Sequence, residues 1–140
     1  MKGFKVRLWD KERKYMIYDL YYEGLFIQDD KIYFITAYNS EVEDWDDVTD
    51  RYESMLCTGL KDKKDKEIYD GDVLGLNKEY YQGQDDYLVE FGNGSFLAKS
   101  CDYIRRIDKV GQRSLGNIGT ELYGVIGNIY ENPNLLIGSD

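Results

Sequence analysis

The sequence predicts a mainly β protein with at most one or two short helices, and three observations support this prediction. Apolar and polar residues alternate over several short stretches, which is the period of a half-buried strand. Glycine, asparagine and aspartate separate these stretches, as they do at tight turns between strands. The 140 residues also include 14 tyrosines and 14 glycines but a single proline. Aromatic residues favour strands and glycines favour tight turns, so composition agrees with pattern.

Two β-hairpins are predicted in the first part of the chain. Every second residue of FKVRLW (4–9) is apolar, DKERK (10–14) turns the chain, and YMIYDLYY (15–22) alternates again. The stretch LFIQDDKIYFITAY (25–38) repeats this design, with Asp29 and Asp30 at its turn. Short polar side chains tolerate turn dihedrals and bond locally to the backbone, which favours a reversal at this point.

The acidic segment 40–53 has two interpretations. Ser40 and Glu43 have the spacing of a capping box, and apolar residues recur at helical spacing. A short amphipathic helix is therefore one prediction. Aspartate, valine and threonine are poor helix formers, so an acidic surface loop fits the same residues. The apolar positions in question are Val42, Trp45, Val48, Tyr52 and Met55.

The second half predicts short strands joined by turns. MLCTG (55–59) is expected to be a strand that stops at Gly59, and LKDKKDKE (60–67) an exposed charged turn. A reversal at Asp70 and Gly71 leads into the next strand, because glycine adopts positive φ without strain. DYLVEFGNGSFLA (86–98) is the clearest hairpin, and 101–120 is expected to be a loop. ELYGVIGNIYEN (121–132) is the last predicted strand, and PNLL (133–136) one helical turn.

These elements predict a domain organisation. Five or more short strands with tight turns in residues 58–140 favour a small, strongly bent barrel of the SH3-like kind. Residues 1–57 form the N-terminal β-hairpin region, with the acidic segment 40–53 as a short helix or a loop. A chain of this length can bury enough apolar surface to fold unaided, and we expect one compact unit. Hairpins with tyrosines on both faces leave edges and rings uncovered, which predicts self-association.

Composition and charge disfavour several functions. The chain has no histidine and a formal net charge of −9, so it lacks the usual general base and zinc ligand, and it would be repelled by nucleic acid and anionic membranes. No apolar run is long enough to span a bilayer, and no signal peptide is recognisable, so we expect a cytoplasmic protein. Cys57 and Cys101 match no metal or redox spacing and are expected to be buried thiols.

No chemical site is predicted. Asp70 with Asp72, and Asp44 with Asp46 and Asp47, are carboxylate groups that could hold a divalent cation, but such pairs more often solvate turns. The GNGSF segment (92–96) belongs to a hairpin, which disfavours a phosphate-binding role. No spacing supplies a base for a nucleophile. We therefore expect no enzyme activity, no cofactor and no metal.

Four segments resemble one protein family. They are FKVRLWD (4–10), TGLKDKKDKEIYDGDV (58–73), VEFGNGSF (89–96) and GVIGNIYENPNLL (124–136). In this order they are similar to the signature segments of the YopX family of phage and prophage proteins. Lys64, Asp65 and Cys57 depart from the usual family residues, and 20–50 has no recognisable family pattern. The resemblance implies a mainly β fold with an SH3-like portion and assembly into homo-oligomers, in a host bacterial cell. It implies no established biochemical role and no site residues.

Two functions remain as hypotheses. The first is a non-catalytic oligomeric assembly or protein-interaction module, whose partners are other copies of the chain and an unidentified host or phage protein. The alternative is a nucleic-acid-binding module, or an acidic mimic that occupies a DNA-binding partner, and the overall acidity disfavours direct binding. The interaction residues nominated from the basic segments and their aromatic neighbours are Trp9, Lys11, Arg13, Lys14, Tyr103, Arg105 and Arg106.

Overall fold

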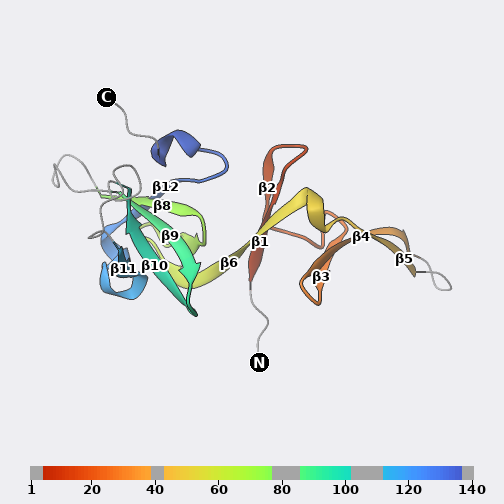
Figure 1. The fold of residues 1–140 in the computed structure, drawn as a ribbon, viewed down its shortest axis with the longest axis horizontal. Helices are drawn as coiled ribbons and strands as arrows, with labels where there is room; N and C mark the ends of the chain where they lie inside the picture. The colour runs from red at the N-terminus through yellow and green to blue at the C-terminus, as the bar shows by residue number, and fades with distance from the viewer. Residues whose placement is uncertain (1–4, 39–42, 77–85, 102–111, 137–140) are drawn as a thin grey trace. The chain divides into compact units, whose positions relative to one another are not determined.

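The computed structural model describes residues 5–38, 43–76, 86–101 and 112–136, and it is mainly β with no long helix (Figure 1). The predicted fold class is therefore confirmed. The chain divides into two compact units, which we call the N-terminal unit, Lys5–Met55, and the C-terminal unit, which begins at Leu56. None of the helical segments in the described ranges has the length and apolar character needed to cross a membrane.

Both predicted N-terminal hairpins are present. In the first, β1 (Val6–Asp10) pairs antiparallel with β2 (Tyr15–Ile17). In the second, β3 (Leu25–Gln28) pairs with β4 (Lys31–Tyr38). Asp29 and Asp30 adopt φ of 52° and 62° at its turn, as in the two-residue turns that match the twist of a hairpin.

A third strand, β5 (Glu43–Asp47), pairs with β4, so that β3, β4 and β5 form a three-stranded sheet. The 3-10 helix η1 (Thr49–Arg51) then leads into β6 (Tyr52–Lys61). Strand β1 lies between β2 and β6, and β7 (Glu67–Tyr69) follows β6 in the same sheet. The core of the N-terminal unit consists of Leu8, Ile17, Leu25 and Ile32.

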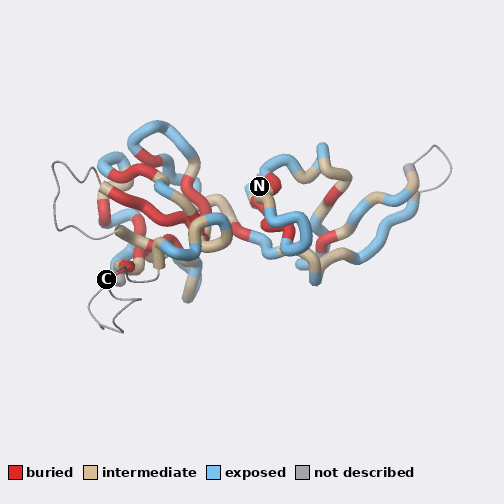
Figure 2. The backbone as a smooth tube through the Cα atoms, turned by 90° about the horizontal axis from the view of Figure 1, so that it is seen from above, coloured by how far each residue is buried: buried red, intermediate tan, exposed pale blue. Residues whose placement is uncertain are grey.

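The C-terminal unit contains a five-stranded sheet that curls like half a barrel. Its strands lie in the order β11 (Gln112–Ser114), β10 (Ser95–Ser100), β9 (Tyr87–Gly92), β8 (Asp72–Gly75) and β12 (Gly124–Asn128). Its main core cluster includes Ile68, Leu74, Val89, Ala98 and Leu115. Buried stretches run through this unit in Figure 2, whereas the ribbon of β4 and β5 is largely exposed.

Several local predictions in this unit are confirmed. The β9–β10 hairpin turns at Asn93 and Gly94, which both adopt positive φ. Gly71 has φ of 90° at the expected reversal. The helical turn after Asn132 is the 3-10 helix η4 (Pro133–Leu136). Proline begins this helix because its fixed φ suits the first helical position.

Other local predictions are wrong. Residues 43–47 form a strand, where we expected a helix or a loop, because hydrogen-bonded pairing with β4 outweighs their weak intrinsic preferences. Strand β6 continues past Gly59 to Lys61. In place of one strand over 121–132, the 3-10 helix η3 (Thr120–Leu122) precedes β12. The expected loop contains β11 and the 3-10 helix η2 (Leu115–Asn117), and its residues 102–111 lie outside the described ranges.

Candidate interaction surface

The basic turn between β1 and β2, residues 11–14, is held by the carboxylate of Asp10. The backbone N–H groups of Glu12 and Arg13 each donate to Asp10 Oδ1 over 3.0 Å. Lys14 N–H donates to the backbone carbonyl of Asp10 over 2.8 Å, and Lys14 itself has φ of 60°. These bonds fix the backbone of the turn, while residues 11–14 are all exposed.

Asp10 is also bound by Arg51, which closes the end of η1. The Arg51 Nε and Nη2 groups donate to Oδ1 and Oδ2 of Asp10 over 3.1 and 3.0 Å, a bidentate geometry that is stronger than a neutral hydrogen bond. Burial raises the pKa of Asp10, but the hydrogen bonds from Arg51, Arg13 and Glu12 lower this pKa more, so that it lies below the ordinary value. Through Asp10, the basic turn is thus connected to Arg51, the residue that precedes β6.

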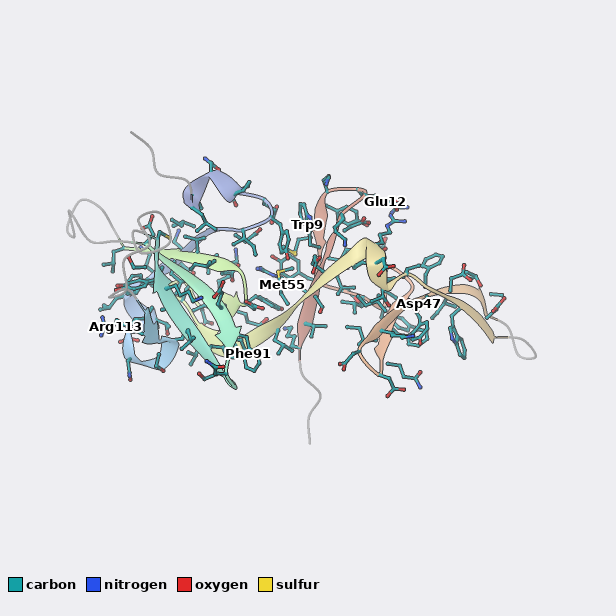
Figure 3. All side chains as sticks on the ribbon, in the orientation of Figure 1. Trp9, Glu12, Asp47, Met55, Phe91 and Arg113 are labelled. Atoms are coloured by element: carbon teal, nitrogen blue, oxygen red, sulfur yellow. The ribbon has the colours of Figure 1, made fainter. Side chains whose placement is uncertain are left out.

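The nominated interaction residues fall into three groups. Lys11, Arg13 and Lys14 are exposed on the basic turn, where Lys11 lies 3.5 Å from Glu53 in a surface ion pair. Trp9, which Figure 3 labels, lies on β1 and is only 7% exposed, so its ring is not open for the surface contact for which it was nominated. Residues 7–10 of β1 are all buried, so neither face of this strand is open to solvent there. The nominated residues Tyr103, Arg105 and Arg106 lie outside the described ranges.

Three aromatic rings meet on the sheet β3–β4–β5, one from each strand. The rings of Phe26 and Tyr33 stack with centroids 5.2 Å apart, and the ring of Trp45 meets Phe26 edge-on at 5.7 Å. Alternation places Phe26 and Tyr33 on the face opposite the core residues Leu25 and Ile32. We call this the aromatic face. Phe26 and Tyr33 are half-buried, and Trp45 is 43% exposed.

The outer strand β5 beside this face is acidic. Its sequence is EDWDD, and Asp44, Asp46 and Asp47 are all exposed. Asp47 accepts a hydrogen bond from the Thr49 hydroxyl over 2.6 Å and lies 3.8 Å from Lys31 Nζ. Charged side chains on an outer strand oppose the addition of another strand. The flat aromatic face is therefore better suited to contact than the β5 edge.

A small pocket of about 180 Å³ lies next to the basic turn in the N-terminal unit. Its apolar walls are formed by Phe34 of β4, Val48 and Tyr52, and Arg13, Glu23 and Arg51 supply the charged groups. The Arg51 guanidinium also lies 5.5 Å from the centroid of the Tyr52 ring. Burial raises the pKa of Tyr52, so this phenol stays neutral at physiological pH.

The aromatic face was missed at the level of sequence although part of its signal is present. Alternation in residues 25–38 separates Phe26 and Tyr33 from Leu25 and Ile32, which predicts that the two rings share a face. The sequence does not place Trp45 with them, because segment 40–53 predicts a helix or a loop and not a strand. The antiparallel pairing of β5 with β4, in which Trp45 lies opposite Ile35, adds the third ring to this face.

Metal chemistry finds no support in the described residues. No group of three histidine, cysteine, aspartate or glutamate side chains is placed there to hold an ion. Asp72, one of the predicted carboxylates, is buried and accepts the Tyr69 N–H over 2.8 Å, which is a structural role in the turn. Cys101 is a buried thiol as predicted, and Cys57 is only half-buried.

Comparison with known proteins places this chain in a family. None of the curated proteins is significantly similar to it. The crystal structure of protein EF1440 from Enterococcus faecalis has 26% identity and a TM-score of 0.60, covering 97% of this chain and 99% of that one. The crystal structure of protein yopX from Bacillus subtilis has a TM-score of 0.61 at 24% identity, with all of both chains covered, and shows a similar fold. A family model described as YopX protein matches residues 5–137, and the chain therefore belongs to the YopX family.

Proposed function

We propose that this YopX family member is a non-catalytic protein of phage or prophage origin that associates with copies of itself through the aromatic face. The observation that carries this proposal is the meeting of Phe26, Tyr33 and Trp45 on the face that points away from the core. Tryptophan and tyrosine are the residues that most often supply binding energy at protein interfaces. The phage origin rests on the family resemblance alone.

The charge of β5 favours a basic surface as the partner of this face. Asp44, Asp46 and Asp47 are exposed on β5, and alternation places Asp47 on the same face as Trp45. Like charges facing each other would oppose association. The exposed basic turn 11–14 of a second copy supplies the opposite charge, and its lysine and arginine side chains can also stack on aromatic rings. Association of this kind weakens as salt rises, because exposed charges are screened.

Sedimentation velocity of the full chain tests the proposal. At micromolar concentration we expect a mass above the 16.4 kDa of one chain. As salt is raised, the measured mass should fall toward the mass of one chain. Trp45→Thr removes one ring of the aromatic face and should weaken association about tenfold or more.

The control variant is Phe91→Thr, which removes a ring that is 47% exposed on β9 of the C-terminal unit. This change should leave the mass distribution as it is in the wild type. A wild-type protein that sediments as a single chain at every concentration would contradict self-association. Equal effects of the two variants would contradict the assignment of the contact to the aromatic face.

A further inference from the structure

The turn between β2 and β3 presents two adjacent tyrosines to solvent. Tyr21 is 90% and Tyr22 is 84% exposed, more than any other large apolar or aromatic side chain in the described residues. The backbone beneath them is fixed, because the Glu23 and Leu25 N–H groups both donate to the Leu20 carbonyl, over 3.1 and 2.9 Å. We call residues 20–24 the tyrosine turn. A rigid turn that carries exposed rings loses little conformational freedom on binding.

The tyrosine turn borders the 180 Å³ pocket. Glu23 belongs to the turn and lines the pocket. The ring of Phe34 lies against Gly24, where a Cβ atom would come within 3.3 Å of Phe34 Cε2. Glycine at this position, with φ of +73°, therefore lets the turn and the pocket wall pack closely. The protruding rings and the pocket belong to one surface patch.

Size indicates what the pocket can hold. Pockets that bind small-molecule ligands or cofactors usually measure about 300–1,000 Å³, so 180 Å³ is small for such a ligand. It is several times the ~30 Å³ that one water molecule occupies in the liquid. One aromatic side chain is of a size that fits between these limits.

The polar groups of the pocket already bind a phenol. Arg13 Nη1 donates to the Tyr15 hydroxyl over 3.5 Å, and that hydroxyl donates to Glu23 Oε2 over 3.1 Å. A guanidinium carries five donors and a carboxylate accepts several hydrogen bonds. Arg13 and Glu23 thus keep the capacity to bind a second hydroxyl, while Phe34, Val48 and Tyr52 offer apolar contact to its ring.

We propose that the tyrosine turn of one copy inserts a ring into the pocket of a second copy, and that the second copy returns the same contact. This inference rests on the self-association proposed above and adds a second contact, on the opposite face of the β3–β4–β5 sheet, because Phe34 pairs with Leu25 and points away from the side of Tyr33. In a two-fold dimer the same patch meets itself. Glu23 belongs to both the tyrosine turn and the pocket, so both lie on the patch that meets itself. Two copies can therefore each insert a ring into the other and form a closed dimer. Insertion in one direction only would instead build open chains.

The first test compares the dissociation constants of the full-length protein by sedimentation equilibrium. Tyr21→Ala and Tyr22→Ala, made singly and together, decide which ring enters the pocket. The double variant should dimerise at least about tenfold more weakly than the wild type, as expected for loss of an interface tyrosine. Phe91→Ala, a comparable exposed ring in the C-terminal unit, should have no effect.

The second test mixes two variants that each lack half of the contact. Val48→Phe fills the pocket, and the Tyr21→Ala, Tyr22→Ala variant has no ring to insert. Neither should dimerise well alone. A mixed dimer retains one of the two contacts, so an equimolar mixture should associate more tightly than either variant. Thermal unfolding shows whether Val48→Phe folds, and if it does not, Arg13→Ala at the pocket replaces it.

The outcomes separate the two proposals. If the wild type associates and Trp45→Thr weakens it but the double tyrosine variant does not, the exchanged contact is wrong and the proposed function stands. Failure of the mixture to associate more tightly than its components likewise contradicts the reciprocal exchange. A wild-type protein that never associates would contradict the proposed function itself. Species that grow beyond a dimer with concentration would contradict closed two-fold exchange.

Discussion

At the scale of single residues, Asp10 is a buried charge that organises the basic turn of the N-terminal unit. Its carboxylate is 0% exposed and accepts hydrogen bonds from the Glu12 and Arg13 backbone and from Arg51. A buried carboxylate is stable only when such donors replace water. The bonds also orient the basic turn, so the position of Arg13 at the pocket follows from Asp10.

Replacing this carboxylate should destabilise the protein. Asp10→Asn removes the buried carboxylate that Arg51 binds through two nitrogens, and we expect the free energy of unfolding to fall by about 1.5–3 kcal/mol, the range for hydrogen bonds to a charged group. Urea titration of the purified variant measures the change. Glu12→Gln is the matched control, because Glu12 also contacts Arg51, over 2.9 Å, but its side chain is 70% exposed. Glu12→Gln should lower the free energy of unfolding by less than about 1 kcal/mol. Similar decreases in both variants would show that Asp10 has no special role.

At the scale of the elements, Asp62 connects the charged turn after β6 to strand β12. Its Oδ1 accepts the Lys64 and Lys66 N–H groups over 2.8 and 2.9 Å, and its Oδ2 accepts the Val125 N–H over 2.9 Å. Burial raises the pKa of Asp62, but these backbone hydrogen bonds lower it more, so the pKa lies below the ordinary value. The charged segment is thus an organised turn around one buried carboxylate.

The lowered pKa gives a pH-dependent prediction. The ionised Asp62 stabilises the fold at pH values above its unfolded pKa of about 3.9, and this contribution is lost as pH falls through the lower folded pKa. Asp62→Asn should therefore reduce the free energy of unfolding by about 1–3 kcal/mol at neutral pH. The difference from the wild type should shrink in acid, below about pH 4. Urea titrations across pH measure both effects.

Asp65→Asn provides the comparison for this experiment. Asp65 lies in the same turn with φ of 66°, a conformation that asparagine also accepts. Its side chain is 84% exposed and makes only a surface ion pair with Lys61. We expect a small, pH-independent change. A difference between wild type and Asp62→Asn that persists undiminished at low pH would rule out the carboxylate as its source.

At the scale of the whole molecule, net charge disfavours the nucleic-acid hypothesis. The chain has a formal net charge of −9. The exposed basic turn itself contains the acidic residue Glu12, and its Lys11 forms an ion pair with Glu53. Affinity for nucleic acid comes largely from unpaired basic groups that release counterions. We expect no mobility shift with single- or double-stranded probes over a salt series. A shift that weakens as salt rises would instead favour the nucleic-acid hypothesis.

The sequence by itself determined the elements whose causes are local. The turns at Asp29–Asp30, Gly71 and Asn93–Gly94 were predictable because these residues adopt the required positive φ at little cost. The alternating strands beside them followed from their period of two. The family was also recognisable from short segments, since each is contiguous in the chain.

Only the tertiary structure decided the features that depend on distant residues. Residues 43–47 are a strand because β4 pairs with them, and this pairing completes the aromatic face. Trp9 is buried and Asp62 bonds to Val125, 63 positions away. The pocket joins Arg13, Phe34 and Tyr52 from three separate segments. Local preferences of a fraction of a kcal/mol carry no information about such contacts, which form only when the sheets close.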